Sequence, residues 1–125
     1  MNVLIVDDND NCLQLLRRIM ESVPNAQTTA AFSGCEAWWH LSDPGKSFDL
    51  LIADVNMPVI SGLSLIQRIR ATPTLRELRV ILCSGIHDRK TVESIQPLGV
   101  SHYVVKPYGI TTMLDKINLA LASLP

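Results

Sequence analysis

Hydrophobic and polar residues follow two different patterns along this chain. Four short apolar runs, rich in β-branched residues and without internal alternation, are typical of strands covered on both faces: Val3 to Val6, Leu50 to Ala53, Val80 to Cys83 and Tyr103 to Val105. Between these runs, apolar residues recur at helical spacing. The pattern therefore predicts strands that alternate with amphipathic helices.

Each predicted helix has one apolar face. The faces are formed by Cys12, Leu15, Leu16, Ile19 and Val23 in the first helix, by Leu65, Ile66 and Ile69 in the third, and by Ile110, Met113, Leu114, Ile117 and Leu121 in the last. These positions predict which side of each helix packs on a sheet.

Three segments have weaker patterns. Residues 27–32 are expected to form a second strand, and residues 33–41 a helix with Ala37, Trp38 and Leu41 turned inward and Trp39 turned outward. A further helix over residues 88–96 carries only Val92 and Ile95 as an apolar pair and ends before Pro97. We expect this helix to be the most loosely packed.

Strands and helices that alternate over 125 residues predict a single α/β domain spanning residues 1–125. Its expected architecture is a flavodoxin-like (βα)5 fold, a doubly wound parallel sheet with right-handed crossovers and strand order 2-1-3-4-5. Both faces of such a sheet are covered by helices.

Composition narrows the classes of partner and compartment. The chain has 11 Lys and Arg against 12 Asp and Glu and no basic cluster, so nucleic acid is not expected as a direct partner. The apolar run after Met1 is too short for a signal peptide or a membrane span, so no membrane partner is expected. Cys12, Cys35 and Cys83 lack metal-site spacing and are interpreted as reduced, which favours the cytoplasm.

Polar residues follow the apolar strands at the ends where ligands gather in such a sheet. Asp7 and Asp8 follow the first strand, Asp54 the third, Ser84 the fourth and Lys106 the fifth. Two carboxylates about 4 Å apart repel by roughly 4 kcal/mol at an effective dielectric constant of 20, so a cluster of three needs cations. Oxygen ligands favour Mg²⁺ over zinc or copper.

This arrangement makes Asp54 a candidate nucleophile, because an ionised carboxylate can attack phosphorus and hold an aspartyl phosphate. Mg²⁺ and Lys106 would neutralise charge on the phosphoryl oxygens, and Ser84 could donate its hydroxyl to them.

The chain resembles the receiver domains of response regulators, the phosphorylated proteins of two-component signalling systems. The resemblance rests on four segments in order: residues 6–9 (Val-Asp-Asp-Asn), residues 54–58 (Asp-Val-Asn-Met-Pro) with Gly62, Ser84-Gly85, and residues 103–107 (Tyr-Val-Val-Lys-Pro). It implies that Asp7, Asp8, Asp54 and the backbone carbonyl of Asn56 bind Mg²⁺, that Asp54 is the phosphoacceptor, and that Ser84 and Lys106 contact the phosphoryl group.

The same resemblance implies further roles. The Lys106–Pro107 peptide bond is expected to be cis. Tyr103 matches the aromatic residue of the switch, which turns inward when Ser84 moves toward the phosphoryl group. Asn56 and Ile86 match the positions that tune the lifetime of the phosphorylated state.

The partners implied are a sensor histidine kinase or a histidine phosphotransfer protein as donor, and a downstream protein or fused output domain as receiver of the signal. The expected output surface is formed by the helix over residues 88–96, the strand that contains Tyr103 and the last helix, including Leu119 and Ala122. The same surface is also a candidate face for a phosphorylation-dependent homodimer. Trp39 is a second candidate docking point. The chain is expected to be either a stand-alone regulator or a part of a longer protein.

Acidic residues at the ends of strands also allow three other interpretations. A hydrolase of the haloacid dehalogenase type also uses Mg²⁺ and an Asp nucleophile, but it needs Asp-x-Asp after the first strand, where this chain has Asp7 and Asp8 side by side. A flavin-binding module would place a phosphate beside these acids, which would repel it. The third alternative is a domain whose acids have no chemical role and are only solvated at the ends of loops. We therefore expect a phosphoacceptor that assists its own phosphorylation and dephosphorylation rather than an enzyme that turns over a small substrate.

Overall fold

Five parallel strands form the centre of the computed structural model, which describes residues 1–85, 90, 93–94, 96–100 and 102–122. The strands are β1 (Asn2–Val6), β2 (Gln27–Ala31), β3 (Leu50–Asp54), β4 (Arg79–Ser84) and β5 (His102–Val105). Their order in the sheet is β2-β1-β3-β4-β5, and every neighbouring pair is parallel. The predicted flavodoxin-like α/β fold and strand order are confirmed.

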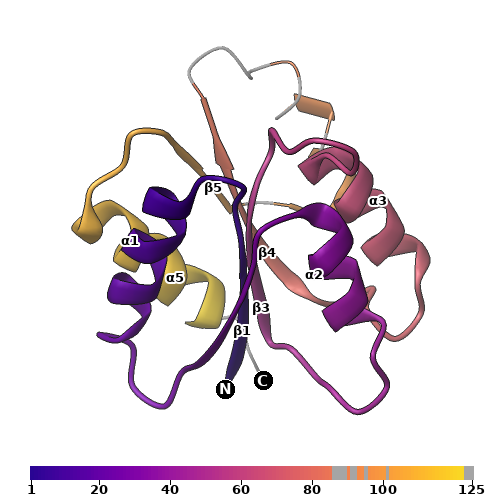
Figure 1. Cartoon of the computed structure of the whole chain (residues 1–125), viewed down its shortest axis with the longest axis horizontal. Coiled ribbons are helices and arrows are strands. Elements are labelled where there is room, and N and C mark those ends of the chain that lie inside the picture. Colours follow the sequence, from indigo (N-terminus) through magenta and orange to yellow (C-terminus); the bar gives the residue numbers. More distant parts are fainter. Residues whose placement is uncertain (86–89, 91–92, 95, 101, 123–125) are drawn as a thin grey trace.

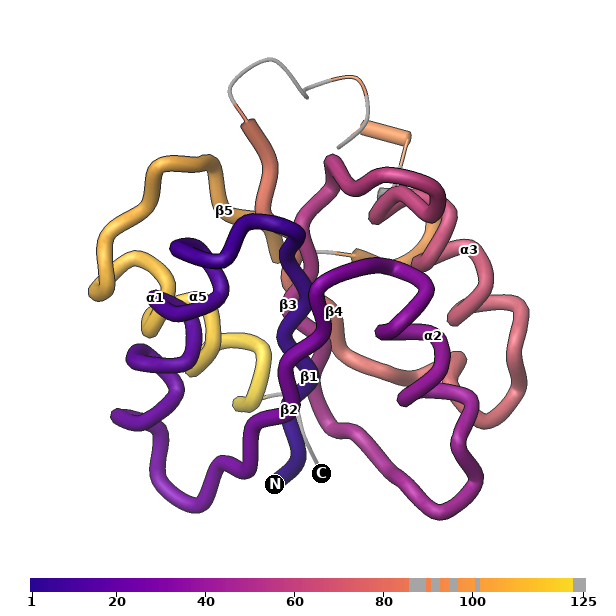
Figure 2. Tube along the Cα trace, viewed as in Figure 1, coloured from indigo at the N-terminus to yellow at the C-terminus, as the bar shows by residue number. Residues whose placement is uncertain are grey.

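Helices cover both faces of this sheet. In Figures 1 and 2, α1 (Asp10–Met20) and α5 (Ile110–Ala122) lie on one face, and α2 (Gly34–Leu41) and α3 (Gly62–Ala71) lie on the other. A short 3-10 helix, η1 (Gln96–Leu98), precedes β5. The layers follow from the sequence, because β1 and β3 offer apolar side chains to both faces.

Three helices begin where a side chain caps the backbone. The side chains of Asn9, Ser33 and Ser61 accept hydrogen bonds from the N–H groups of Cys12, Glu36 and Ser64. Each bond satisfies a backbone donor that has no partner within its helix, which fixes the residue at which the helix starts. The first and third of these helices begin shortly after the acidic ends of β1 and β3.

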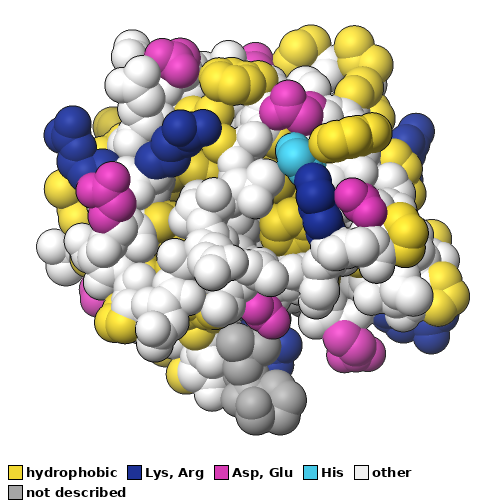
Figure 3. Space-filling view, turned by 60° about the horizontal axis from the view of Figure 1, so that its bottom comes forward, with side chains coloured by type: hydrophobic (Ala, Val, Ile, Leu, Met, Phe, Trp, Pro, Cys, Tyr) yellow, Lys and Arg dark blue, Asp and Glu magenta, His cyan; other side chains and the backbone are white. Residues whose placement is uncertain are grey.

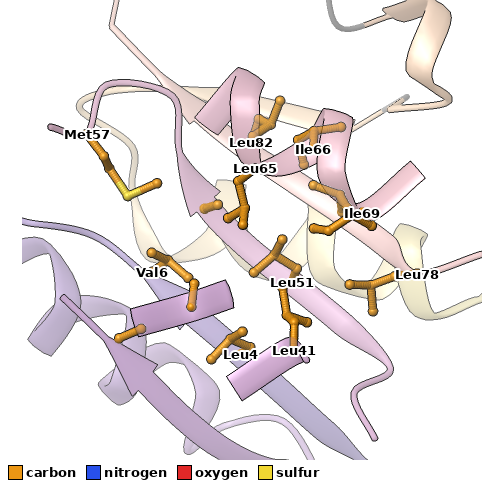
Figure 4. Close-up of a cluster of buried hydrophobic side chains, with 14 of the residues drawn as sticks. Leu4, Val6, Leu41, Leu51, Met57, Leu65, Ile66, Ile69, Leu78 and Leu82 are labelled. Carbon is orange, nitrogen blue, oxygen red and sulfur yellow. The ribbon is translucent and has the colours of Figure 1, made fainter. Parts of the chain in front are cut away.

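Two hydrophobic layers hold the helices to the sheet. One layer lies under α2 and α3 and includes Leu4, Leu51, Leu65, Ile66 and Ile69, several of which are drawn in Figure 4. The other lies under α1 and α5 and includes Ile5, Ile52, Ile81, Met113 and Ile117. Leu4, Ile5, Leu51 and Ile52 are fully buried because the two layers meet on opposite sides of the same strands.

The buried faces of α1 and α5 differ from the prediction. In α1, Leu13 and Met20 are buried with Leu16 and Ile19, whereas Cys12 and Leu15 are only partly buried. In α5, Ala120 is buried and Ile110 is 49% exposed. Both helices carry apolar residues around more of their circumference than one face needs, so contact with the sheet decides their rotation.

The edge strands differ from the expectation of strands covered on both sides. Strand β5 is at the edge of the sheet, and its Tyr103 and Val105 side chains are 40% and 46% exposed. At the opposite edge, β2 ends at Ala31, one residue earlier than predicted, and Phe32 is 50% exposed. A short apolar run alone does not reveal that its strand has only one neighbour.

The remaining expectations have mixed outcomes. Helix α2 buries Ala37 and Leu41 and exposes Trp39, as predicted. Most of the helix expected over residues 88–96, including Val92 and Ile95, lies outside the described residues.

All three cysteines are free, and burial raises the pKa of the Cys83 thiol to about 12, so this thiol stays protonated. Among the described residues, no helix is long and apolar enough to cross a membrane.

Candidate functional site

The carboxyl ends of four neighbouring strands bring their polar residues together. Asp7 and Lys106 directly follow β1 and β5, while Asp54 and Ser84 are the last residues of β3 and β4. Because the strands are parallel and in register, with Asp54 opposite Cys83 and Ser84 opposite Val105, these ends lie at one edge of the sheet. Asp7, Asp54 and Ser84 are at most 7% exposed, in contrast to most polar residues of the described chain.

Lys106 connects two of these strand ends. Its Nζ lies 2.9 Å from Asp7 Oδ2 and 3.4 Å from Asp54 Oδ2. Burial alone would lower the pKa of Lys106, but the hydrogen bond to Asp7 and the charges of Asp54 and Asp7 outweigh it and raise the pKa above the ordinary value for lysine. Lys106 therefore remains a fixed positive charge between two carboxylates.

The environment of Asp54 acts on its carboxyl group in opposite directions. Burial raises the pKa of Asp54, Lys106 lowers it, and the charge of Asp7 raises it again, with a net shift upward. The ionised carboxylate is therefore held at a cost in free energy that an additional cation or a covalent change would relieve.

Asp7 is held by two partners. One carboxylate oxygen accepts a hydrogen bond from the backbone N–H of Asn9 at 2.9 Å, and the other accepts a hydrogen bond from the Lys106 ammonium group. Asn9 also caps α1, so the helix start and the orientation of Asp7 depend on the same residue. Sequence reasoning gave Asn9 no role of its own, although Asn directly before a helical pattern is the usual signal for an N-cap.

Three carboxylates at this edge meet the requirements of a hard divalent cation. One oxygen from each of Asp7, Asp8 and Asp54 lies within 4.8 Å of the others, and Asp8 is exposed to solvent. Carboxylate oxygens with an open side toward water suit Mg²⁺, which keeps part of its hydration shell. The donor set therefore fits the predicted metal.

The loop after Asp54 is packed closely against the strand end. The Asn56 N–H donates a hydrogen bond to Asp54 Oδ1 at 3.4 Å, so Asn56 lies beside the carboxylate. A Cβ on Gly62 would approach Asp54 O to 2.6 Å and Val55 Cα to 2.7 Å, which leaves room only for glycine. In the same loop Val59 has a φ of 67°, a conformation that costs a β-branched residue free energy.

The other predicted site residues lie around this centre. Ser84 is 1% exposed, and its carbonyl accepts the backbone N–H of Lys106 at 2.7 Å. The Lys106–Pro107 peptide bond is cis. Tyr103, three residues before Lys106, points partly to solvent. Ile86 lies outside the described residues.

Comparison with known proteins assigns a family to this geometry. The family model of the response regulator receiver domain matches residues 3–118. The chain is 28% identical over 123 residues to the chemotaxis protein CheY1 of Helicobacter pylori, covering 98% of each, and 30% identical over 118 residues to the chemotaxis protein CheY of Pseudomonas aeruginosa, covering 94% of each. A solved response regulator receiver protein from Pseudomonas putida is 31% identical, superposes with a TM-score of 0.83, and the match covers 94% of this chain and 95% of that one.

Proposed function

This chain belongs to the family of response regulator receiver domains, and on that premise we propose that it is a signalling switch turned on by a phosphoryl group on Asp54. Receiver domains are phosphoacceptor signalling domains rather than classical enzymes. The observation that carries the proposal is the Lys106 ammonium lying within 3.4 Å of the carboxylates of both Asp7 and Asp54, with Asp8 beside them. Among the residues that the structure describes, no feature of the site favours the hydrolase alternative.

The transfer that we propose begins with an ionised Asp54. A carboxylate oxygen of Asp54 attacks the phosphorus of a phosphohistidine, an O–P bond forms, and the N–P bond to the donor imidazole breaks, so that the electron pair leaves with the imidazole nitrogen. Lys106 faces the place where phosphoryl charge accumulates, and the Ser84 hydroxyl would donate to a phosphoryl oxygen. Asp7, Asp8, Asp54 and the Asn56 carbonyl would hold Mg²⁺, which would supply neutralising charge when bound.

The signal leaves the site through Ser84 and Tyr103 in this proposal. Moving a two-state equilibrium from 1:99 to 99:1 takes about 5.5 kcal/mol of differential interaction. Hydrogen bonds from Ser84 and Lys106 to phosphoryl oxygens, at about 1.5–3 kcal/mol each, would supply much of this free energy. Movement of Ser84 toward the phosphoryl group would draw the Tyr103 ring inward and change the surface of β5 and α5.

The partners are proposed on the same basis. A histidine kinase or a histidine phosphotransfer protein would be the donor, and a downstream protein or fused output domain would read the surface that includes Tyr103, Leu119 and Ala122. Leu119 is 57% exposed and Tyr103 is 40% exposed, so apolar contact area is available there. The same surface is our candidate for a phosphorylation-dependent homodimer. The cytoplasmic location expected from the sequence stays a prediction.

Phosphorylation with acetyl phosphate and Mg²⁺ tests the acceptor. We expect intact-mass spectrometry to show a single phosphoryl adduct on the parent protein and none on Asp54→Asn. The matched control is Asp115→Asn on α5, an exposed acid that should leave the adduct unchanged. A full adduct on Asp54→Asn would show that the acceptor is elsewhere.

Two further measurements test the metal and the lifetime. Mg²⁺ should raise the melting temperature of the unphosphorylated protein, because a ligand that binds only the folded state stabilises it, and Asp8→Asn should remove that gain. Ile86→Glu should shorten the lifetime of the phosphorylated state, because a polar side chain there would help to orient the attacking water. If Mg²⁺ still raised the melting temperature of both Asp7→Asn and Asp8→Asn by as much as that of the parent protein, the proposed metal site would be wrong.

A further inference from the structure

A second concave site lies at the other end of the sheet from Asp54. It has a volume of about 610 Å³ and lies between the carboxyl ends of α2 and α3 and the loops that lead into β3 and β4. Figure 3 brings this end of the molecule forward and shows hydrophobic side chains among charged ones around a hollow. The volume is within the range of about 300–1,000 Å³ that is typical of small-molecule pockets.

The base of the pocket is aromatic and aliphatic. Five of its apolar lining residues belong to the hydrophobic layer under α2 and α3 or pack against it: Trp38, Leu41, Phe48, Leu75 and Leu78. Leu41 and Leu78 are almost completely buried. The base is therefore continuous with the core and largely preformed, and an apolar group that entered would exchange water for side-chain contact.

The charged groups of the rim have an excess of acids. Asp43, Asp49 and Glu77 line the pocket, against the two bases Lys46 and Arg79. The Lys46 ammonium offsets part of this excess, because its Nζ lies 4.0 Å from Asp43 Oδ2, and both side chains are 38% exposed. The same Nζ also lies 2.9 Å from His40 Nδ1 and 4.9 Å from the centre of the Trp39 ring, and neither of these residues lines the pocket.

The two helix ends add to this negative potential. Helix α2 ends at Leu41 and α3 ends at Ala71, and the residues that follow them, Ser42 and Thr72, both line the pocket. The carboxyl end of a helix carries the negative end of its dipole, which favours a cation nearby. The dipoles and the carboxylates therefore act in the same direction.

The Trp38 ring provides a surface that accepts a positive charge. The guanidinium carbon of Arg68 already lies 5.8 Å from the centre of this ring, within the distance of a cation–π contact. A ligand with an apolar body and a cationic head would meet an aromatic wall and carboxylates in the same cavity.

We propose that this pocket binds a small organic cation, with an aromatic or aliphatic body against Trp38 and Phe48 and an ammonium or guanidinium head toward Asp43 and Glu77. Such a site is separate from phosphoryl acceptance at Asp54 and does not depend on it. It would give the domain a second input at the opposite end of the sheet.

A titration with three probes of matched shape tests the proposal: phenethylammonium, 2-phenylethanol and 3-phenylpropionate. Chemical-shift changes in ¹H–¹⁵N spectra should map to the Trp38 indole N–H and to the amides of residues 41–49 and 72–79. We expect phenethylammonium to bind tighter than the neutral probe by roughly fivefold to tenfold and the anionic probe to bind weakest. Trp39→Phe removes the second indole signal and assigns the first.

Charge variants sharpen this test. Glu77→Gln and Asp43→Asn should each weaken phenethylammonium binding and leave 2-phenylethanol binding unchanged, whereas Asp115→Asn on the opposite face of the sheet should change neither. Equal affinity for the charged and neutral probes, shifts that map away from residues 38–49 and 72–79, or equal effects of Glu77→Gln and Asp115→Asn would overturn the proposal.

A Lys or Arg side chain next to an apolar residue of another polypeptide offers the same chemistry as a free organic cation. Acetyl-Phe-Arg-amide distinguishes the two sources. If the ligand is a free organic cation, as we propose, phenethylammonium should bind at the same residues at least as tightly as this peptide. Much tighter peptide binding would overturn the small-molecule assignment and identify the pocket as a peptide site.

Discussion

The middle and the carboxyl end of the same strands use burial for opposite purposes. In β3, Leu51 and Ile52 are fully buried between two hydrophobic layers, and two residues later Asp54 is 7% exposed beside Asp7 and Lys106. The apolar positions gain free energy from leaving water. The acidic positions lose free energy, and the loss is offset only where a hydrogen bond or an opposite charge is present.

This contrast explains why the Asp54 carboxyl group can be held in an electrostatically unfavourable position. The two hydrophobic layers stabilise the fold well enough to keep charged groups together at one edge. The mid-strand positions therefore determine whether the domain folds, and the strand ends determine what it does. Removing a buried apolar side chain and removing the buried acid should therefore change stability in opposite directions.

The largest effect is expected in the middle of the sheet. Leu51→Ala should lower the free energy of unfolding by about 2–5 kcal/mol, because it leaves a cavity between β1, β4 and α3. Urea denaturation followed by circular dichroism measures the change. Leu119→Ala, at a residue that is 57% exposed, is the matched control and should have almost no effect. A loss below that of the control would mean that this layer repacks freely.

A smaller loss is expected from Lys106, the cation that pairs with both Asp7 and Asp54. Lys106→Met leaves Asp7 and Asp54 facing each other without a positive charge, and partial exposure of Lys106 limits the cost to about 1–3 kcal/mol. The measurement is urea denaturation in Mg²⁺-free buffer, with Lys116→Met as control. Adding Asp54→Asn to Lys106→Met should recover part of the loss, and failure to do so would show that the two carboxylates do not repel.

Removing the buried acid should have the opposite sign. Asp54→Asn should raise stability at pH 7 in Mg²⁺-free buffer by about 1 kcal/mol, the size of an ordinary single-site effect. The folded-state pKa of Asp54 is raised, so the parent protein loses stability as pH rises from the ordinary aspartate pKa of 3.8 through the raised value. The gain of the variant should therefore grow across that window and stay constant above it. A gain that is independent of pH would contradict the raised pKa.

The sequence predicted those parts of the molecule for which one pattern has one structural meaning. The apolar runs of β1, β3 and β4 indicate strands covered on both faces, and the polar residue after each run marks the edge where Asp7, Asp54 and Ser84 lie. The strand order followed from the number of alternating elements. Local pattern and chain connectivity were sufficient for these features.

Other features depend on contacts that no local pattern encodes. In α1, a face with Cys12 and Leu15 and a face with Leu13 and Met20 have nearly the same period, and only packing on the sheet selects the second. The exposure of Tyr103 follows from the position of β5 at the edge of the sheet. Asn9, which orients Asp7, was not identified because its hydrogen bond to the acid depends on the backbone turn between them.

The smallest expected effect is at Tyr108, which lies where the apolar layer meets the acidic edge. Its ring packs against the layer under α1 and α5, while Cys83, Cys12, Asp7 and Asp54 are near enough to act on its hydroxyl. Burial raises the pKa of Tyr108 further above its ordinary value than any of these neighbours does, and the described structure gives the buried hydroxyl no hydrogen-bond partner. Because an unpaired buried hydroxyl is unfavourable, Tyr108→Phe should raise the free energy of unfolding by about 0.5–1 kcal/mol. Thermal unfolding measures the change, and Tyr103→Phe, at a ring that is 40% exposed, should leave stability unchanged. A loss of stability in Tyr108→Phe would show that the hydroxyl is paired and that the polar network of the strand ends reaches into the hydrophobic layer.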